Sequence, residues 1–269
     1  MRPVCLITGA SAGIGADLAR VFASHGHALV LAARRGPQLD ALAHEIAAGG
    51  HTRPKVVATD LALRDGPARL AEALYAGGLE PAIVVNNAGF GLLGAAADLD
   101  RDQQLAMIDL NVRALTDLSL RWVDSVIRHR GGILNVASIA GFMPGPGMAV
   151  YHASKAYVLS FTEALHSELK ASGARVCALC PGPVETEFVN RAGIPHDYFP
   201  RFLRRSTVRV AREGYAGFMG GRRVIVPGVA NRVVSWLPRL MPRALMLAMI
   251  ERRWNRTRTG SRAQTPSRF

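Results

Sequence analysis

Tyr151 and Lys155 are four residues apart in the segment YHASK, and Ser138 precedes Tyr151 by thirteen residues. A helix beginning near Tyr151 would place the phenol and the ammonium group on one face. A tyrosine with its ordinary pKa of about 10 is a poor acid–base catalyst at neutral pH, but a nearby cation stabilises the phenolate and lowers that pKa. The spacing therefore predicts an acid–base centre, although Y-x-x-x-K alone is a common pattern.

A glycine-rich segment, TGASAGIG (residues 8–15), follows the first apolar run and opens a helical pattern. Glycine lets the backbone turn sharply and approach a ligand with no Cβ in the way, and a helix N-terminus offers free N–H groups and partial positive charge. The segment predicts a pyrophosphate-binding turn. Its spacing is G-x-x-x-G-x-G, which differs from the G-x-G-x-x-G of the commonest dinucleotide sites.

The second apolar run ends in two arginines and no acidic residue. Many dinucleotide sites place a carboxylate there, on the adenosine ribose. Arg34 and Arg35 instead suit a 2′-phosphate, through charge-assisted and bidentate hydrogen bonds. This pattern favours NADP over NAD; a solvated basic turn before Pro37 is the alternative.

Short polar residues follow three further apolar runs: Asp60-Leu61, NNAG (residues 86–89) and Ser138. Such residues bind ligands at the carboxyl edge of a parallel sheet, or merely cap turns. Cys177 and Cys180 form the pattern C-x-x-C, but they fall on an expected strand, where alternation places them on opposite faces. We therefore predict no metal site.

Apolar runs alternate with helical patterns along most of the chain. The expected strands are residues 4–8, 28–33, 55–59, 82–86, 132–138, 175–180 and 222–227, and the expected helices are 13–25, 38–48, 65–77, 101–129 and 151–172. Alternation of this kind, with continuously apolar strands, is typical of a parallel sheet covered on both faces. The predicted fold class is α/β: a single Rossmann-type, doubly wound parallel sheet of about seven strands with helices on both faces.

Together these motifs resemble the short-chain dehydrogenase/reductase family. The matching motifs occur in the family's order and spacing: TGASAGIG (8–15), Asp60, NNAG (86–89), Asn111 in LNVRAL, Ser138, YHASK (151–155) and PGPVET (181–186). The resemblance covers about residues 3–228. It implies an oxidoreductase that transfers hydride with a nicotinamide cofactor.

The resemblance also implies roles for individual residues. Tyr151 would be the general acid in reduction and the base in oxidation, while Lys155 would hold the nicotinamide ribose and lower the pKa of Tyr151. Ser138 would bind the substrate oxygen, and Asn111 would position a water in a proton relay. The residues expected to bind the cofactor are Gly9, Ser11, Gly13, Ile14, Gly15, Arg34, Arg35, Asp60, Leu61, Asn87, Ala88, Gly89, Tyr151, Lys155, Pro181, Gly182 and Thr186.

Positive charge is concentrated in the C-terminal quarter of the chain. The 269 residues carry a formal net charge of +13, and residues 201–269 contain 16 arginines, no lysine and two acidic residues. Such a segment binds nucleic acid, an acidic membrane surface or an anionic substrate, or is simply solvated. The apolar content of 49% excludes a wholly disordered chain, and three cysteines exclude a disulfide framework.

We expect residues 1–228 to form the catalytic domain, with a substrate lid at about 187–221, where aromatic and basic residues interrupt the alternation. Residues 229–269 would form a basic, partly helical extension whose last 15 or so residues are disordered. Residues 233–258 suit an interfacial membrane helix; packing on the domain or on a second subunit is the alternative. The expected location is cytoplasmic, with peripheral contact at the inner face of a membrane as a further option.

The sequence thus predicts an NADP(H)-dependent oxidoreductase that interconverts a ketone or 3-oxoacyl group and a secondary alcohol, as a homodimer or homotetramer. The aromatic lid favours a hydrophobic substrate. One rival is a non-catalytic dinucleotide-binding or regulatory protein, against which the intact set of candidate catalytic residues argues. The other is nucleic-acid binding through the arginine-rich end, for which the sequence has no base-reading motif.

Overall fold

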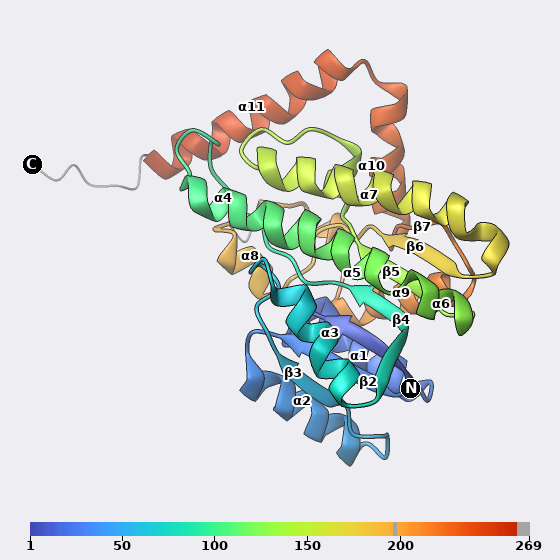
Figure 1. Cartoon of the computed structure of the whole chain (residues 1–269). Coiled ribbons are helices and arrows are strands. Elements are labelled where there is room, and N and C mark those ends of the chain that lie inside the picture. The colour runs from blue at the N-terminus through green and yellow to red at the C-terminus, as the bar shows by residue number, and fades with distance from the viewer. Residues whose placement is uncertain (196–197, 263–269) are drawn as a thin grey trace, which may run out of the picture.

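Seven parallel strands form one sheet in the structure, a computed structural model that describes residues 1–195 and 198–262. The strands are β1 (Arg2–Thr8), β2 (Leu29–Ala33), β3 (Lys55–Ala58), β4 (Leu79–Asn86), β5 (Gly132–Val136), β6 (Arg175–Leu179) and β7 (Val224–Ile225). Within the described residues they pair in the order β3-β2-β1-β4-β5-β6-β7 (Figure 1). The strand order reverses between β1 and β4, which is where open α/β sheets bind ligands. The predicted fold class is confirmed.

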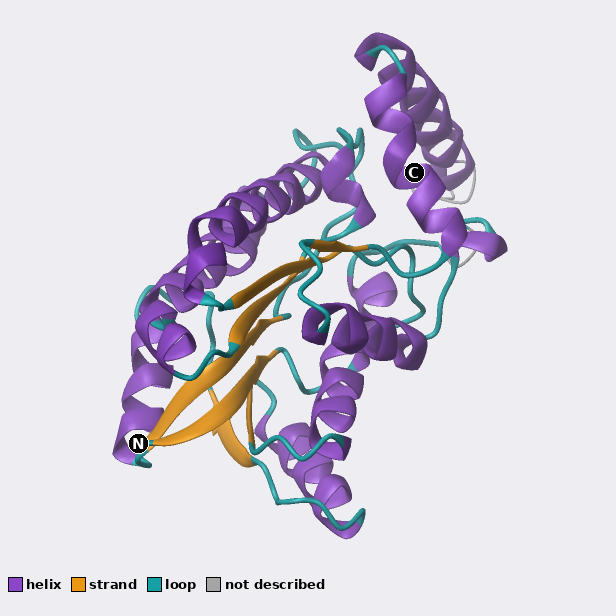
Figure 2. Cartoon of the chain, turned by 90° about the vertical axis from the view of Figure 1, so that its right-hand side faces the viewer, coloured by secondary structure: helices purple, strands orange, loops and turns teal. Residues whose placement is uncertain are grey.

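Helices cover both faces of the sheet, and Figure 2 shows the strands between the two helical layers. One layer contains α1 (Gly13–Ser24), α2 (Gly36–Ala48) and α9 (Thr207–Met219), and the other contains α3 (Gly66–Ala76), α5 (Leu115–Arg121), α6 (Val123–Arg128) and α7 (Ala149–Leu169). Phe22 and Phe218 are fully buried under the first layer, and Leu70 and Trp122 under the second. Because both faces are covered, the strands appear in the sequence as continuous apolar runs.

The helix expected over residues 101–129 is interrupted twice. α4 (Arg101–Ile108) runs into a π-helical turn, Asp109–Ala114, and α5 is separated from α6 at Trp122. The π-helical turn contains Asn111, whose side chain bonds to groups outside this helix. Such turns are frequent at functional sites. They depend on tertiary contacts, which apolar periodicity does not report.

The C-terminal part of the chain forms two helices, α10 (Val229–Leu240) and α11 (Arg243–Arg262) (Figures 1 and 2). We expected disorder from about residue 255, whereas α11 continues to residue 262; residues 263–269 lie outside the described part of the chain. The ring of Trp254 lies where a Cβ on Gly147 would be, so it ties α11 to the loop before α7. Across residues 1–195 and 198–262, no helix is long and apolar enough to cross a membrane.

Candidate active site

A cavity of about 570 Å³ lies along the carboxyl ends of β1 to β6 and gathers nearly all of the predicted site residues. The predicted residues that line it are Gly9, Ser11, Gly13, Ile14, Arg34, Arg35, Asp60, Leu61, Asn87, Ala88, Gly89, Ser138, Tyr151, Lys155, Pro181, Gly182 and Thr186. Gly15 and Asn111 do not line it. The sheet therefore brings residues more than 170 positions apart to one edge.

The glycine-rich turn packs directly on the loop after β4. Gly9 has a φ of +65°, and a Cβ there would lie 2.8 Å from the Cα of Ala88. The Asn87 side chain donates to the carbonyl oxygens of Thr8 (3.0 Å) and Gly9 (3.1 Å). Asn87 thus holds the turn in place. Because glycine has no Cβ, a ligand can approach the backbone of the turn closely.

Arg34 and Arg35 lie at one end of the cavity with carboxylates nearby. Arg35 donates to the hydroxyl oxygen of Ser11 over 3.1 Å and forms an ion pair with Glu187 over 2.8 Å. A guanidinium nitrogen of Arg34 lies 3.8 Å from the Asp60 carboxylate. Both arginines are about half exposed, so they remain accessible to a ligand anion.

Arg191, which sequence analysis missed, joins this end of the cavity from α8 (Glu187–Arg191). Burial lowers the pKa of Arg191, and the positive charges of Arg34 and Arg35 lower it further. Its guanidinium also lies 5.2 Å from the centroid of the Phe90 ring, in a cation–π contact. The concentration of positive charge suits a phosphate.

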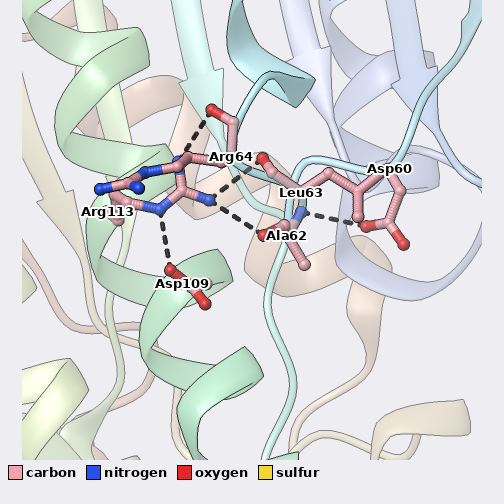
Figure 3. A network of polar contacts seen from close by, with 6 residues as sticks. All are labelled: Asp60, Ala62, Leu63, Arg64, Asp109 and Arg113. Atoms are coloured by element: carbon pink, nitrogen blue, oxygen red, sulfur yellow. Dashed lines mark hydrogen bonds and ion pairs between the residues drawn. The ribbon is translucent and has the colours of Figure 1, made fainter.

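A second residue that the motifs did not reveal, Arg113, braces the loop after Asp60. Figure 3 shows its guanidinium pointing at this loop from the π-helical turn. The guanidinium donates to the carbonyl oxygens of Ala62 (2.9 Å), Leu63 (3.0 Å) and Arg64 (3.2 Å), and to Asp109 (2.8 Å). The Asp60 carboxylate accepts from the backbone N–H of Ala62 over 3.0 Å. In the sequence, Asp109 and Arg113 signal only an ordinary i,i+4 helix pair.

Ser138, Tyr151 and Lys155 meet in the middle of the cavity. The Lys155 ammonium lies 5.9 Å from the centroid of the Tyr151 ring and donates to the Val136 carbonyl oxygen over 2.8 Å. Burial raises the pKa of Tyr151 to about 12, and a hydrogen bond with Ser138 lowers it by less. Burial also lowers the pKa of Lys155 to about 8. Burial thus has the largest influence on the Tyr151 pKa, and the influence that opposes it is the Ser138 hydrogen bond, not the expected effect of the Lys155 charge.

Asn111 is buried behind this group. Its side-chain oxygen accepts from the Phe90 N–H over 3.1 Å, and its amide donates to the Phe90 carbonyl (2.9 Å) and to the Ser154 hydroxyl oxygen (3.1 Å). Both ends of the amide are therefore in use. Asn111 connects the loop after β4 to α7, the helix that carries Tyr151 and Lys155.

The far end of the cavity is apolar. Its lining includes Met143, Met148, Phe188, Val189, Ile194, Tyr198, Phe199, Leu203, Val234 and Ile250. The ring centroids of Phe188 and Tyr151 are 5.4 Å apart, so apolar surface lies directly beside the phenol. Val234 and Ile250 come from α10 and α11, which therefore form part of this cavity.

The segment expected to form a substrate lid, residues 187–221, divides into two parts in the structure. Described residues between 187 and 203 line the cavity, whereas residues 207–219 form α9, which packs on α1. Tyr215 and Phe218 are buried in the core. The reason is topological: a helix must connect the parallel strands β6 and β7, and its aromatic side chains cover the sheet. Cys177 and Cys180 also lie in the interior, in different core clusters.

Comparisons with known proteins identify the family of the chain. Residues 3–195 match the family model described as short chain dehydrogenase. The chain is similar to sulfoacetaldehyde reductase 2 of Chromohalobacter salexigens, with 37% identity over 193 residues that cover 70% of this chain and 75% of the relative.

Several solved structures match nearly the whole chain, including those of two different proteins. One is a short-chain dehydrogenase from Sphingobium yanoikuyae in complex with NADPH, with 30% identity, a TM-score of 0.76 and coverage of 99% of this chain and 98% of that one. The other is the bulky-bulky ketone specific alcohol dehydrogenase from Comamonas testosteroni, with 26% identity, a TM-score of 0.72 and coverage of 100% and 96%.

Proposed function

Because the chain belongs to the short-chain dehydrogenase family and is therefore an oxidoreductase, we propose that it reduces a bulky hydrophobic ketone to the secondary alcohol with NADPH. The observation that carries this proposal is the continuity of the cavity. A cationic end, an acid–base group and an apolar end line one space of about 570 Å³. This order matches the parts of the reaction: cofactor phosphates, the reacting carbonyl and the substrate's apolar body.

The residues fit a nicotinamide dinucleotide. The turn around Gly9 and Gly13 has positive φ values and leaves no room for a Cβ at Gly9, as a pyrophosphate-binding turn requires. Arg34 and Arg35 would bind a 2′-phosphate, which is why we favour NADP. The other residues assigned to the cofactor are Ser11, Ile14, Gly15, Asp60, Leu61, Asn87, Ala88, Gly89, Tyr151, Lys155, Pro181, Gly182 and Thr186.

When bound, the nicotinamide supplies hydride to the carbonyl carbon in reduction and accepts it in oxidation. Ser138 hydrogen-bonds the substrate oxygen and orients it toward Tyr151. Tyr151, whose pKa of about 12 keeps the phenol protonated at neutral pH, donates its proton to that oxygen and completes the alcohol. The Lys155 charge stabilises the phenolate that Tyr151 becomes, and Asn111 fixes the helix that carries both groups.

The substrate class follows from the apolar end. Phe188 covers one side of Tyr151, and Val234 and Ile250 close the space from the C-terminal helices. A polar or anionic substrate would leave its charge desolvated against these side chains. The similarity to the bulky-ketone enzyme of Comamonas testosteroni supports the same choice, whereas the similarity to the sulfoacetaldehyde reductase supports a small anionic aldehyde.

The test is NADPH oxidation by the purified protein across a carbonyl panel. The panel runs from sulfoacetaldehyde and short 3-oxoacyl thioesters to diaryl ketones and ketosteroids, and NADPH without carbonyl is the blank. We expect kcat/KM to rise by about tenfold or more from the small carbonyls to the bulky ones, because each added apolar group fills the apolar end. Highest kcat/KM with sulfoacetaldehyde would overturn the substrate class, and no oxidation with any carbonyl would overturn the reaction.

A further inference from the structure

The C-terminal helices α10 and α11 present two different faces. The inner face belongs to the protein interior: Asn231 is 1% exposed and donates to the carbonyl oxygens of Leu203 (3.2 Å) and Pro227 (3.0 Å). Val234 and Ile250 line the cavity from this side. Internal packing therefore accounts for the inner face of these helices. Membrane contact, another expectation for this segment, can involve only the outer face.

The outer face carries large apolar side chains that are exposed among the described residues. On α10 the exposed residues recur at helical spacing, which forms one stripe along the helix: Val229, Val233, Trp236, Leu237 and Leu240. Leu245 and Met249, four residues apart, continue it on α11. Leu240, at the corner between the helices, is 82% exposed. Figure 2 shows the two helices standing off from the sheet and its helical layers at one end of the molecule.

Charge identifies the partner of this outer face. Residues 229–262 contain eight arginines and one acidic residue, Glu251. Arg232, Arg243 and Arg252 are exposed beside the apolar stripe and the corner. A second copy of this chain would bring the same positive charge against it, which opposes self-association. An apolar stripe bordered by arginines instead matches the two layers of an anionic lipid surface, acyl chains below and negative headgroups above.

We propose that the outer face of α10 and α11 docks on an anionic membrane surface, with the corner at Leu240 inserted deepest. The helices lie in the interface, at the depth of about 5–10 Å that amphipathic helices reach. Neither helix is long and apolar enough to span a bilayer. Arg232 and Arg243 remain at headgroup level.

Docking has a consequence for the substrate, and this consequence rests on the proposed function. Val234 lines the cavity from the same helix whose other side carries Val229 and Leu240. One helix, with a diameter of about 10 Å, therefore separates the apolar end of the cavity from the lipid. Docking would therefore place the active site close to any hydrophobic ketone that is concentrated in the bilayer.

The docking test measures co-sedimentation of the full chain with vesicles, without substrate or cofactor. Vesicles of phosphatidylcholine with phosphatidylglycerol are compared with pure phosphatidylcholine, over a range of salt concentrations. The test variant is Val233→Gln with Leu240→Gln, both at exposed positions. Its matched control is Val208→Gln with Met219→Gln, at exposed apolar positions on α9. NADPH oxidation with a water-soluble ketone and the melting temperature report whether each variant is folded.

We expect the wild type and the α9 control to bind the anionic vesicles and to leave them as salt rises. The Val233→Gln, Leu240→Gln variant should bind about a hundredfold more weakly, because two branched apolar side chains no longer enter the acyl region. Its activity on the water-soluble ketone should remain. Wild-type protein that ignores anionic vesicles at low salt overturns the proposal, as does a variant that binds like the wild type.

A fall in molecular mass of the variant in light scattering, with vesicle binding unchanged, would assign the face to a subunit interface and overturn docking. Because no reaction is measured in the binding assay, the reductase proposal can fail while docking stands, and the reverse also holds.

Discussion

The two ends of the cavity are built in different ways. Apart from Arg191 on α8, the cationic end consists of residues that directly follow β1 to β4, and hydrogen bonds from side chains to the backbone hold them: Asn87 donates to the carbonyls of Thr8 and Gly9, and Arg113 donates to three carbonyls of the loop after Asp60. The apolar end consists of side chains from α8, α10, α11 and loops outside the sheet, including the segment before α7 that carries Met143 and Met148. Packing among side chains fixes their positions.

Because of this difference, cofactor binding and substrate preference can change separately. The side chains of Asn87 and Arg113, which hold the cationic end, do not belong to the apolar end, so cofactor binding should be insensitive to changes at the apolar end. Apolar packing adapts to volume-conserving substitutions, so substrate preference can vary without disturbing the sheet. Substitutions at each end can show whether the two ends are independent. Tyr151 lies between them, and both ends must act together there.

Tyr151→Phe should have the largest effect. The phenylalanine ring fills the same space but has no proton to donate, so kcat should fall by about 10²–10⁴-fold. The Kd for NADPH should stay within about twofold, since the cationic end is untouched. Steady-state kinetics and fluorescence titration measure the two quantities. A variant that keeps more than about a tenth of the wild-type kcat would remove Tyr151 from the acid–base role.

The same difference explains how much the sequence could predict. Strand ends were predictable because continuous apolar runs mark the strands, and all strands of a parallel sheet end at the same edge. Arg113 and Arg191 were not, because their partners are backbone carbonyls and distant arginines that no local pattern encodes. The sequence placed Val234 and Ile250 in the C-terminal extension and did not predict that they line the cavity. Helical periodicity shows that a helix has an apolar face, but it does not show what covers that face.

The double substitution Arg34→Ala, Arg35→Ala should raise the Kd for NADPH by about a hundredfold, through the loss of two charge-assisted contacts of about 1.5 kcal/mol each. The Kd for NADH, which has no 2′-phosphate, should rise less than about threefold. Arg209→Ala with Arg212→Ala, at exposed positions on α9, controls for the general loss of positive charge. Equal losses for both cofactors would show that Arg34 and Arg35 do not read the phosphate.

Ile250→Ala tests the apolar end alone. Removing part of this side chain enlarges the cavity and should lower kcat/KM for a bulky ketone by about tenfold, with the Kd for NADPH unchanged. Met249→Ala is the matched control, because Met249 is the neighbouring residue on the same helix but is 54% exposed on the outer face. If both variants lose the same activity, or if NADPH binding weakens in Ile250→Ala, the two ends are not independent.

Arg113→Met should raise the Kd for NADPH by about fivefold and leave kcat within about twofold, since the loop after Asp60 loses its brace while the reacting groups keep their places. Arg121→Met is the control: Arg121 forms the same kind of i,i+4 pair, with Asp117 over 2.7 Å, one element further along and away from the cavity. A fall in kcat as large as the rise in Kd would mean that Arg113 acts on the π-helical turn and Asn111 instead of on the loop.

The smallest effect concerns pH. Burial lowers the pKa of Lys155 to about 8 and raises that of Tyr151 to about 12. Lys155 is charged below its pKa, so the charge that stabilises the Tyr151 phenolate is present at pH 7 and is lost as pH rises through about 8. Tyr151 itself stays protonated throughout this range.

For ketone reduction at saturating NADPH, kcat/KM should therefore fall by about fourfold from pH 7 to pH 8.5, with the slope of a single proton. Lys155→Arg supplies the decisive comparison, because a guanidinium stays charged across this range and should remove the fall even if the overall rate is lower. If the kcat/KM of Lys155→Arg still falls near pH 8, the titrating group is not Lys155. Another group would then supply the charge on which Tyr151 depends.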